Sequence, residues 1–164
     1  EPASLRDVGC DAAGLVDGLT FPTARPRVMH AERTFWEKAT AIHVFCLQDR
    51  LRGDRFARHW HDVARLDEAG FSDAAIADRE LASAVARHKS MFFAEKATDR
   101  TPIDYEAAVG GGLRLVPGGG GAKALENDYA RMVEDGLLFD DAEPFDALMA
   151  RCADIAARAN RAAQ

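Results

Sequence analysis

Two segments of this sequence carry side chains whose types and spacing suit chemistry on phosphates. Lys38 shares one helical face with the apolar residues Phe35 and Ile42, and Asp62 lies 24 residues later on the inward side of a second amphipathic pattern. A lysine in such a place either extends its ammonium group into solvent or projects into a cleft. Because charges are costly to bury unless they are paired or used, the two residues predict a site. In it Lys38 would bind a polyphosphate, and Asp62 would pair with Lys38 or help to hold a metal ion or nucleotide.

Three further residues are candidates for supporting this site. Arg58 and His59 are on the same helix as Asp62, and Lys89 is on a later helix. The alternatives are structural: Asp62 could form an ordinary ion pair with Arg58 or Arg65, and Lys38 could simply reach solvent.

The sequence offers no metal site of its own. His59 and His61 are two residues apart, so on a helix they point in different directions and cannot chelate one ion together. The glycine runs at 110–112 and 118–121 do not form a phosphate-binding loop, because no Gly-Lys-Ser/Thr closes them. We therefore expect no metal ligands on this chain and a flexible surface loop at the glycines.

The elements that must position these residues are mainly helical. Apolar residues recur at steps of three and four, with Asp54 as a cap for the second helix, whereas Arg27–His30 reads as extended and 97–120 reads as a loop. We predict a predominantly α domain of about five helices at 31–164, after an extended segment at 1–30. The expected helices span about 32–48, 55–69, 74–94, 122–135 and 143–161.

Composition bounds the class of protein. The chain has 164 residues, is 48% hydrophobic and carries a net charge of −6. Residues 25–65 hold nine Lys/Arg and five acidic residues, a local charge of +4 that can attract phosphates. The acidic total argues against a general nucleic-acid binder and against a sequence-specific DNA binder. No apolar run is long enough for a membrane span, and three scattered cysteines favour a reducing compartment, so we expect a cytoplasmic protein.

Several segments together resemble one known family. The sequence is similar, over roughly residues 26–160, to the C-terminal half of the AbiEii-type abortive-infection nucleotidyltransferase toxins. The most specific match is the pair Glu32–Lys38 and Arg58–Asp62, and the supporting matches are His88–Phe93, Leu113–Pro117 and Asn127–Met132.

The resemblance implies a role for each matching residue. In that family an N-terminal α/β nucleotidyltransferase lobe carries a Gly-Ser segment and an Asp-x-Asp motif that binds a divalent metal. The helical C-terminal lobe closes the cleft and supplies a lysine and an aspartate, which match Lys38 and Asp62. Members act in toxin–antitoxin or phage-defence systems, and some transfer nucleotides onto RNA.

This sequence departs from the family pattern in one respect. No Gly-Ser segment followed by Asp-x-Asp occurs in the 164 residues, and the first methionine is Met29. Without metal-binding carboxylates a chain cannot neutralise a triphosphate with Mg²⁺, so we expect this chain alone to be inactive. We expect the missing lobe to lie outside this sequence, with residues 1–30 as its extended remnant.

Two functions follow as hypotheses. In the first, the chain is the helical domain of a nucleotidyltransferase toxin. Lys38 and Asp62 are then catalytic, and Arg58, His59 and Lys89 help to bind the nucleotide. The intact enzyme would use Mg²⁺, an NTP and an RNA acceptor, and it would have a cognate antitoxin. In the second, the chain is a non-catalytic helical module that binds an antitoxin or another partner, and Lys38 and Asp62 form a structural pair.

Overall fold

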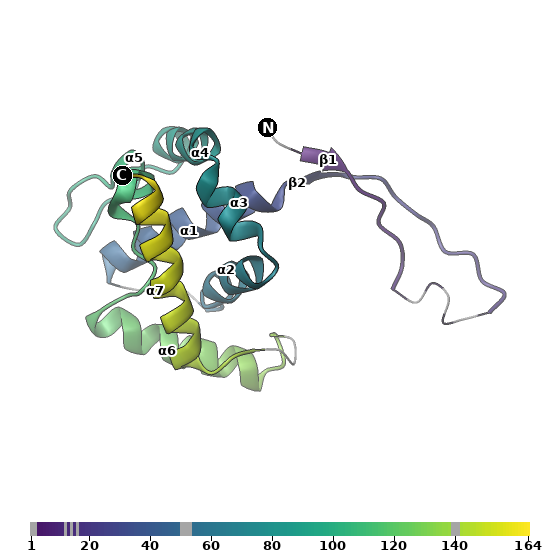
Figure 1. Ribbon diagram of the computed structural model, residues 1–164. Helices are drawn as coiled ribbons and strands as arrows, with labels where there is room; N and C mark the ends of the chain where they lie inside the picture. The colour runs from purple at the N-terminus through teal and green to yellow at the C-terminus, as the bar shows by residue number, and fades with distance from the viewer. Residues whose placement is uncertain (1–2, 12, 14, 16, 50–53, 139–141) are drawn as a thin grey trace.

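The protein is predominantly helical, as the sequence predicts. A computed structural model describes residues 3–11, 13, 15, 17–49, 54–138 and 142–164. The helices form one compact body, and an N-terminal two-stranded arm extends away from it (Figure 1).

Helix α1 (Ala31–Gln48) runs through the centre of the helical body. Its apolar side chains at Phe35, Trp36, Ala39 and Ile42 are fully buried. These residues form the apolar face of the helix, which is why apolar residues recur at steps of three and four in this part of the sequence. Three helices pack against it: α2 (Arg58–Glu68), α3 (Phe71–Ala77) and α4 (Arg79–Phe92).

Two long helices complete the body. Helix α6 (Gly119–Glu134) and helix α7 (Phe145–Ala162) close one side, and α7 packs across α2 and α3 (Figure 1). Leu148, Cys152 and Ile155 of α7 are fully buried in the shared core. Helix α7 thereby helps to fix the position of α2.

Two buried tryptophans connect the helices through their indole nitrogens. Trp36 Nε1 donates a hydrogen bond of 2.9 Å to the Ala75 carbonyl, and Trp60 Nε1 donates one of 2.7 Å to the Leu115 carbonyl. Both rings are fully buried, and each satisfies its one polar atom at a chain segment far away in the sequence. This fixes the rotation of α1 and α2 about their axes, and with it the directions of Lys38 and Asp62.

Two expectations about the elements were wrong. The single helix expected at about 74–94 is divided at Asp78, whose backbone leaves the helical region and whose carboxylate caps α4 by accepting from Leu81 N–H. The region expected to be a loop contains the short helix α5 (Tyr105–Ala107) and the π-helical turn η1 (Ala108–Gly112). Gly111 allows this turn, because its φ of +117° is accessible to glycine and rarely to other residues.

The N-terminal segment forms a hairpin-like arm. Strand β1 (Ala3–Leu5) pairs antiparallel with β2 (Arg27–Met29), which confirms the extended segment expected there. None of the described residues between 3 and 29 is buried. The arm leaves the body where α1 begins (Figure 1), close to the domain boundary that we predict at residue 30.

No helix in the described part of the chain is long and apolar enough to cross a membrane.

Candidate functional site

Lys38 and Asp62 meet between α1 and α2. The Lys38 Nζ donates a hydrogen bond of 2.6 Å to the Asp62 Oδ2, a short charge-assisted contact. The Lys38 side chain is 25% exposed and that of Asp62 is 38% exposed, so the pair lies at the protein surface but is partly shielded from water. The sequence-based expectation that the two charges converge is confirmed, whereas their chemical roles stay predictions.

Glu37, the neighbour of Lys38, holds a second cation. Its carboxylate lies 2.6 Å from Lys89 Nζ and 3.7 Å from His88 Nδ1, and it accepts a hydrogen bond of 3.1 Å from Arg33. Lys89 also lies over the ring of Phe93, with its Nζ 4.7 Å from the ring centroid. Lys89 is therefore held close to the Lys38 site by an ion pair that links α1 with α4. Sequence reasoning missed Glu37, although Arg33 four residues earlier on the same helix was a signal for it.

His59 occupies the middle of the predicted group. Burial is the main cause that lowers its pKa from 6.5 to about 4, and the positive charges of Lys38, Arg58 and Lys89 add to the effect, whereas Asp62 opposes it. The ring packs beside Phe45 and Phe56, and its Nδ1 is buried without a hydrogen-bond partner among the described residues. His59 is thus neutral at physiological pH, and the charges of all four other residues that the sequence singles out act on its pKa.

Arg58 lies on the outer side of α2, beside a groove of about 470 Å³. The residues that line this groove are Arg55, Arg58, His61, Asp62, Arg65, Met132, Leu137 and Leu138. Asp62 therefore belongs to two places, because its Oδ2 contacts Lys38 and its side chain also lines the groove. We name this hollow the arginine groove.

A buried aspartate on α6 builds the start of α2. The Asp128 carboxylate is 4% exposed and accepts hydrogen bonds from the backbone N–H groups of Arg55, at 2.9 Å, and Ala57, at 2.8 Å. The sequence predicts Asp54 as the cap of this helix, but the N-cap position is Ala57, which cannot cap with its side chain. Asp128 was not foreseen, because it lies more than seventy residues from the turn that it stabilises.

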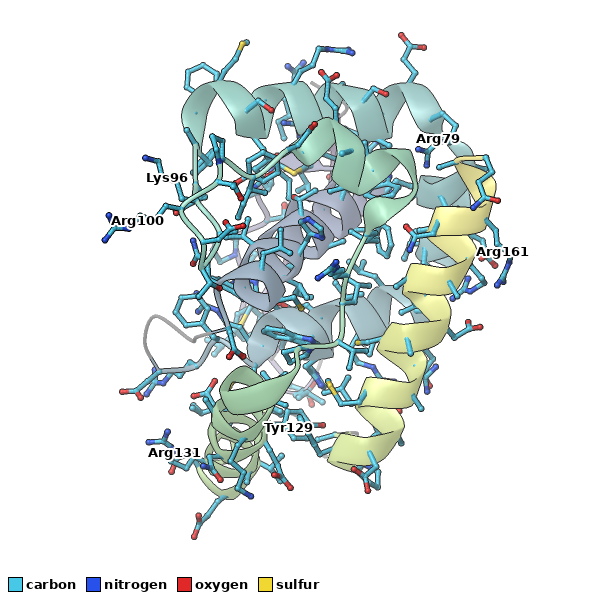
Figure 2. The ribbon with its side chains drawn as sticks, turned by 90° about the vertical axis from the view of Figure 1, so that its left-hand side faces the viewer. Arg79, Lys96, Arg100, Tyr129, Arg131 and Arg161 are labelled. Atoms are coloured by element: carbon cyan, nitrogen blue, oxygen red, sulfur yellow. The ribbon has the colours of Figure 1, made fainter. Side chains whose placement is uncertain are left out.

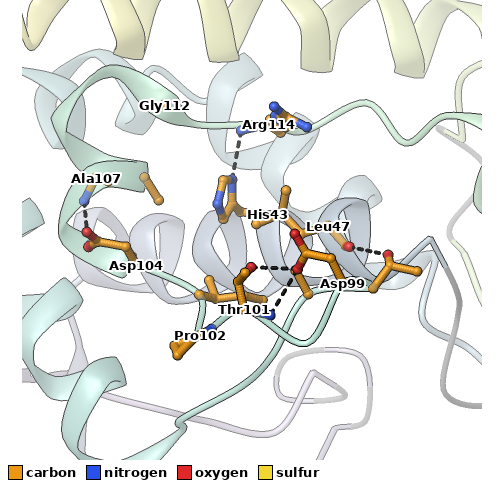
Figure 3. A pocket seen from close by; sticks show the side chains of 13 residues that line it. His43, Leu47, Asp99, Thr101, Pro102, Asp104, Ala107, Gly112 and Arg114 are labelled. Carbon is orange, nitrogen blue, oxygen red and sulfur yellow. Dashed lines mark hydrogen bonds between the residues drawn. The ribbon is translucent and has the colours of Figure 1, made fainter.

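A second hollow lies on a different face of α1. It measures about 510 Å³ and is bordered by residues of α1, of the 97–104 loop and of η1 (Figure 3). His43 stands in it with its Nδ1 accepting from Arg114 N–H at 3.1 Å, and burial lowers the pKa of this histidine to about 4. Asp99 and Asp104 border the same hollow but are engaged locally, by Thr101 and by Ala107 N–H. None of the predicted site residues lines it.

The described part of the chain does not contain a set of ligands for a metal ion. No group of three or more His, Cys, Asp or Glu residues with suitable placement occurs among the described residues. The two carboxylates described in this site, those of Asp62 and Glu37, are already engaged by lysines. The residues present therefore do not fit a Mg²⁺ site, and no chemical step is assigned to a metal held by this chain.

Together the fold and the site define a helical domain that presents a lysine–aspartate pair beside a basic groove. The family model described as "Nucleotidyl transferase AbiEii toxin, Type IV TA system" matches residues 1–151. This chain belongs to that family. Searches among curated proteins and among solved structures return no match.

Proposed function

We propose that this chain forms the helical part of a nucleotidyltransferase toxin and presents Lys38 to the triphosphate of a bound NTP. The single observation that carries the proposal is the contact of 2.6 Å between Lys38 and Asp62 at a partly shielded surface. A triphosphate carries several negative charges, so it would compete strongly with one carboxylate for the Lys38 ammonium group. Membership of a nucleotidyltransferase toxin family supports a phosphate ligand for this lysine.

Asp62 takes part in the same exchange. When Lys38 turns to a phosphate, the Asp62 carboxylate loses its ion-pair partner and faces the arginine groove. A carboxylate so placed can orient an acceptor hydroxyl, or accept its proton, as the hydroxyl oxygen attacks the α-phosphorus and pyrophosphate leaves. Nucleotidyl transfer needs positive charge and in-line placement more than covalent help, and a lysine–aspartate pair supplies both.

Two of the supporting residues flank Lys38. Lys89, held by Glu37, adds positive charge that favours the bound triphosphate. His59 stays uncharged, so it contributes packing and a hydrogen-bonding ring nitrogen to the nucleotide side of the site instead of a charge.

The intact toxin requires groups that this chain does not supply. We propose that Mg²⁺ binds to carboxylates of a nucleotidyltransferase lobe outside this sequence, that residues 1–30 lead from that lobe, and that the complete protein acts in the cytoplasm. The three cysteines of this chain form no disulfide, which supports a reducing compartment for it. An antitoxin partner is suggested by the toxin–antitoxin family.

The proposal is tested by Lys38→Ala in a protein that includes the nucleotidyltransferase lobe. Transfer of a radiolabelled NTP should fall by at least about a hundredfold, because the lost cation acts on the charge of the transition state. The control is Lys123→Ala, which removes an exposed lysine on α6 and should leave transfer unchanged. Undiminished transfer by the Lys38 variant would refute the role of this lysine.

A partner-binding module is the second candidate function. One observation favours it: Met91, Phe92 and Phe93 at the end of α4 are 68%, 69% and 51% exposed. The same assay separates the two candidates. A module predicts that Lys38→Ala leaves nucleotide transfer unaffected, whereas replacement of Phe92 weakens binding of the antitoxin.

A further inference from the structure

The second hollow, between α1 and the 97–104 loop, contains a hydrogen-bond donor that the described part of the chain does not use. His43 stands in this hollow and is only 5% exposed (Figure 3). Its Nδ1 accepts from the Arg114 N–H group, so the proton of the neutral ring is on Nε2. The Nε2–H group has no hydrogen-bond partner among the described residues. Because almost all polar groups of buried side chains are hydrogen-bonded, this donor indicates a place that a ligand can fill.

A cationic side chain borders the same hollow. Arg114 lines it, is exposed, and forms no ion pair with any described residue. Its positive charge acts on the ring of His43, so the guanidinium group lies near that ring. A guanidinium group and an imidazole N–H group are both hydrogen-bond donors. Together they suit the two oxygens of a carboxylate.

Two carboxylates border the hollow as well. Asp99 and Asp104 each use Oδ1 in a local contact, the first with Thr101 and the second with the Ala107 N–H group. The hydrogen bonds from Thr101 lower the pKa of Asp99, so this carboxyl group is charged at neutral pH. Neither aspartate pairs with a cation of the described part of the chain. Their second oxygens can therefore accept hydrogen bonds from an ammonium group.

The loop that forms one wall of the hollow is held in place. Thr98 donates two hydrogen bonds to the Leu47 carbonyl, one from its N–H group at 3.1 Å and one from its hydroxyl at 2.8 Å. An antiparallel bridge between Lys96 and Pro102 closes the loop. Leu47, Pro102 and Ile103 contribute apolar surface to the lining. The volume of about 510 Å³ is in the range of preformed sites for small molecules.

We propose that the second hollow binds a free α-amino acid with an aliphatic side chain. Arg114 and the Nε2–H group of His43 hold the carboxylate. The two aspartates hold the ammonium group, and the apolar lining receives the side chain. A ligand with only negative charge, such as phosphate, would be repelled by the aspartates, and one with only positive charge would be repelled by the arginine. The site is independent of the proposed function, because neither residue of the Lys38–Asp62 pair lines it.

Three probes separate the two charged contacts: L-leucine, isocaproate and isoamylamine. Isocaproate lacks the ammonium group of leucine, and isoamylamine lacks its carboxylate. In NMR titrations of the whole chain at neutral pH, leucine should bind at millimolar concentration or below and shift the ring signals of His43. Each analogue should bind at least about tenfold more weakly, because the hydrogen bonds of one charged group are lost.

The variant Arg114→Gln tests the carboxylate contact. It should weaken binding of leucine at least about tenfold and should not weaken binding of isoamylamine, which has no carboxylate. The backbone N–H group that donates to His43 remains in this variant. The matched control is Arg100→Gln, which removes the same charge from a residue that does not line the hollow. Figure 2 shows Arg100 extending outward at the edge of the molecule, and its replacement should leave leucine binding unchanged. Circular dichroism melts of both variants verify that the fold is retained.

Three results would overturn the assignment. They are unchanged His43 ring signals at millimolar leucine, binding of either analogue as tight as that of leucine, and equal affinities of the two arginine variants for leucine. Tight binding of isocaproate would show that the aspartates hold no ammonium group and that the ligand is a simple carboxylate. The titrations require neither NTP nor nucleotide transfer, so their failure would leave the role of Lys38 to its own test.

Discussion

Glu37 and Lys38 are adjacent in the sequence but connect α1 to different helices. Lys38 pairs with Asp62 of α2, and Glu37 pairs with Lys89 of α4. Consecutive residues on a helix point about 100° apart, so one position of α1 can reach both neighbours. The site therefore depends on the rotation of α1, which is fixed by the buried side chains of Phe35 and Trp36, the two residues before Glu37.

Part of this site was predictable from residue types alone. A lysine within an apolar helical stripe and an aspartate within the next one are visible without any structure, because the period of a helix tells which residues share a face. Glu37 and Asp128 were missed since their partners include Lys89 and Arg55, which lie on distant segments. Sequence periodicity carries no information about such long-range contacts.

Two histidines make stability depend on pH. Burial lowers the pKa of His43 and of His59 from 6.5 to about 4. Between these values the unfolded chain binds more protons than the folded protein, so the free energy of unfolding decreases as pH falls from about 6.5 towards about 4. For the deeply buried His43 the loss is on the order of 3 kcal/mol, because one pKa unit corresponds to about 1.4 kcal/mol.

Histidine ring signals in NMR titrations and urea unfolding across this pH range measure the effect. The variant His43→Gln, whose amide oxygen can still accept from Arg114 N–H, should lose less stability on acidification than the unaltered chain. Titration of His43 close to pH 6.5 would contradict the buried, neutral ring.

At the scale of elements, the boundaries of the helices followed the sequence where packing is regular. Helix α1 was expected at about 32–48 and spans 31–48. The prediction failed at Asp78, because the apolar stripe of Leu81 and Val85 begins only after Asp78 and so gives no sign of the break. It also failed just before the glycines, where α5 and the start of η1 are helical, whereas Gly110 and Gly111 leave the helical region as the expected loop would.

Asp128 should be essential for the start of α2. Replacement by alanine leaves the N–H groups of Arg55 and Ala57 without their acceptor in a buried place, which should lower the free energy of unfolding by about 2–4 kcal/mol. Urea unfolding measures the loss. The control Asp135→Ala removes an exposed carboxylate at the end of α6, the helix that carries Asp128, and should change the free energy of unfolding by less than about 0.5 kcal/mol. Equal effects of the two replacements would show that Asp128 does not hold this turn.

At the scale of the whole molecule, the hairpin arm and the helical body differ in how they are stabilised. The body has a continuous core that includes both tryptophans, whereas the arm consists of two strands of three residues with no buried side chain among those described. An isolated two-stranded hairpin is at best marginally stable in water. We therefore expect the body to keep its fold without the arm, whereas the strand pairing of the arm alone contributes little stability.

Removal of residues 1–29 should leave the helical body folded. We expect the free energy of unfolding of the remaining chain to change by less than about 1 kcal/mol, since no core side chain is lost. Thermal and urea unfolding of the two lengths provide the comparison. A non-cooperative transition in the shorter chain would contradict the domain boundary at residue 30.

The rate of nucleotide transfer by the Lys38→Ala variant, in a protein that carries the nucleotidyltransferase lobe, decides whether Lys38 acts on the triphosphate. Measured at limiting and at saturating NTP, it separates a loss of nucleotide binding from a loss of transition-state stabilisation. We expect kcat/KM to fall by at least about a hundredfold while the unfolding midpoint stays unchanged. A rate equal to that of the Lys123→Ala control would show that the Lys38–Asp62 contact serves structure alone.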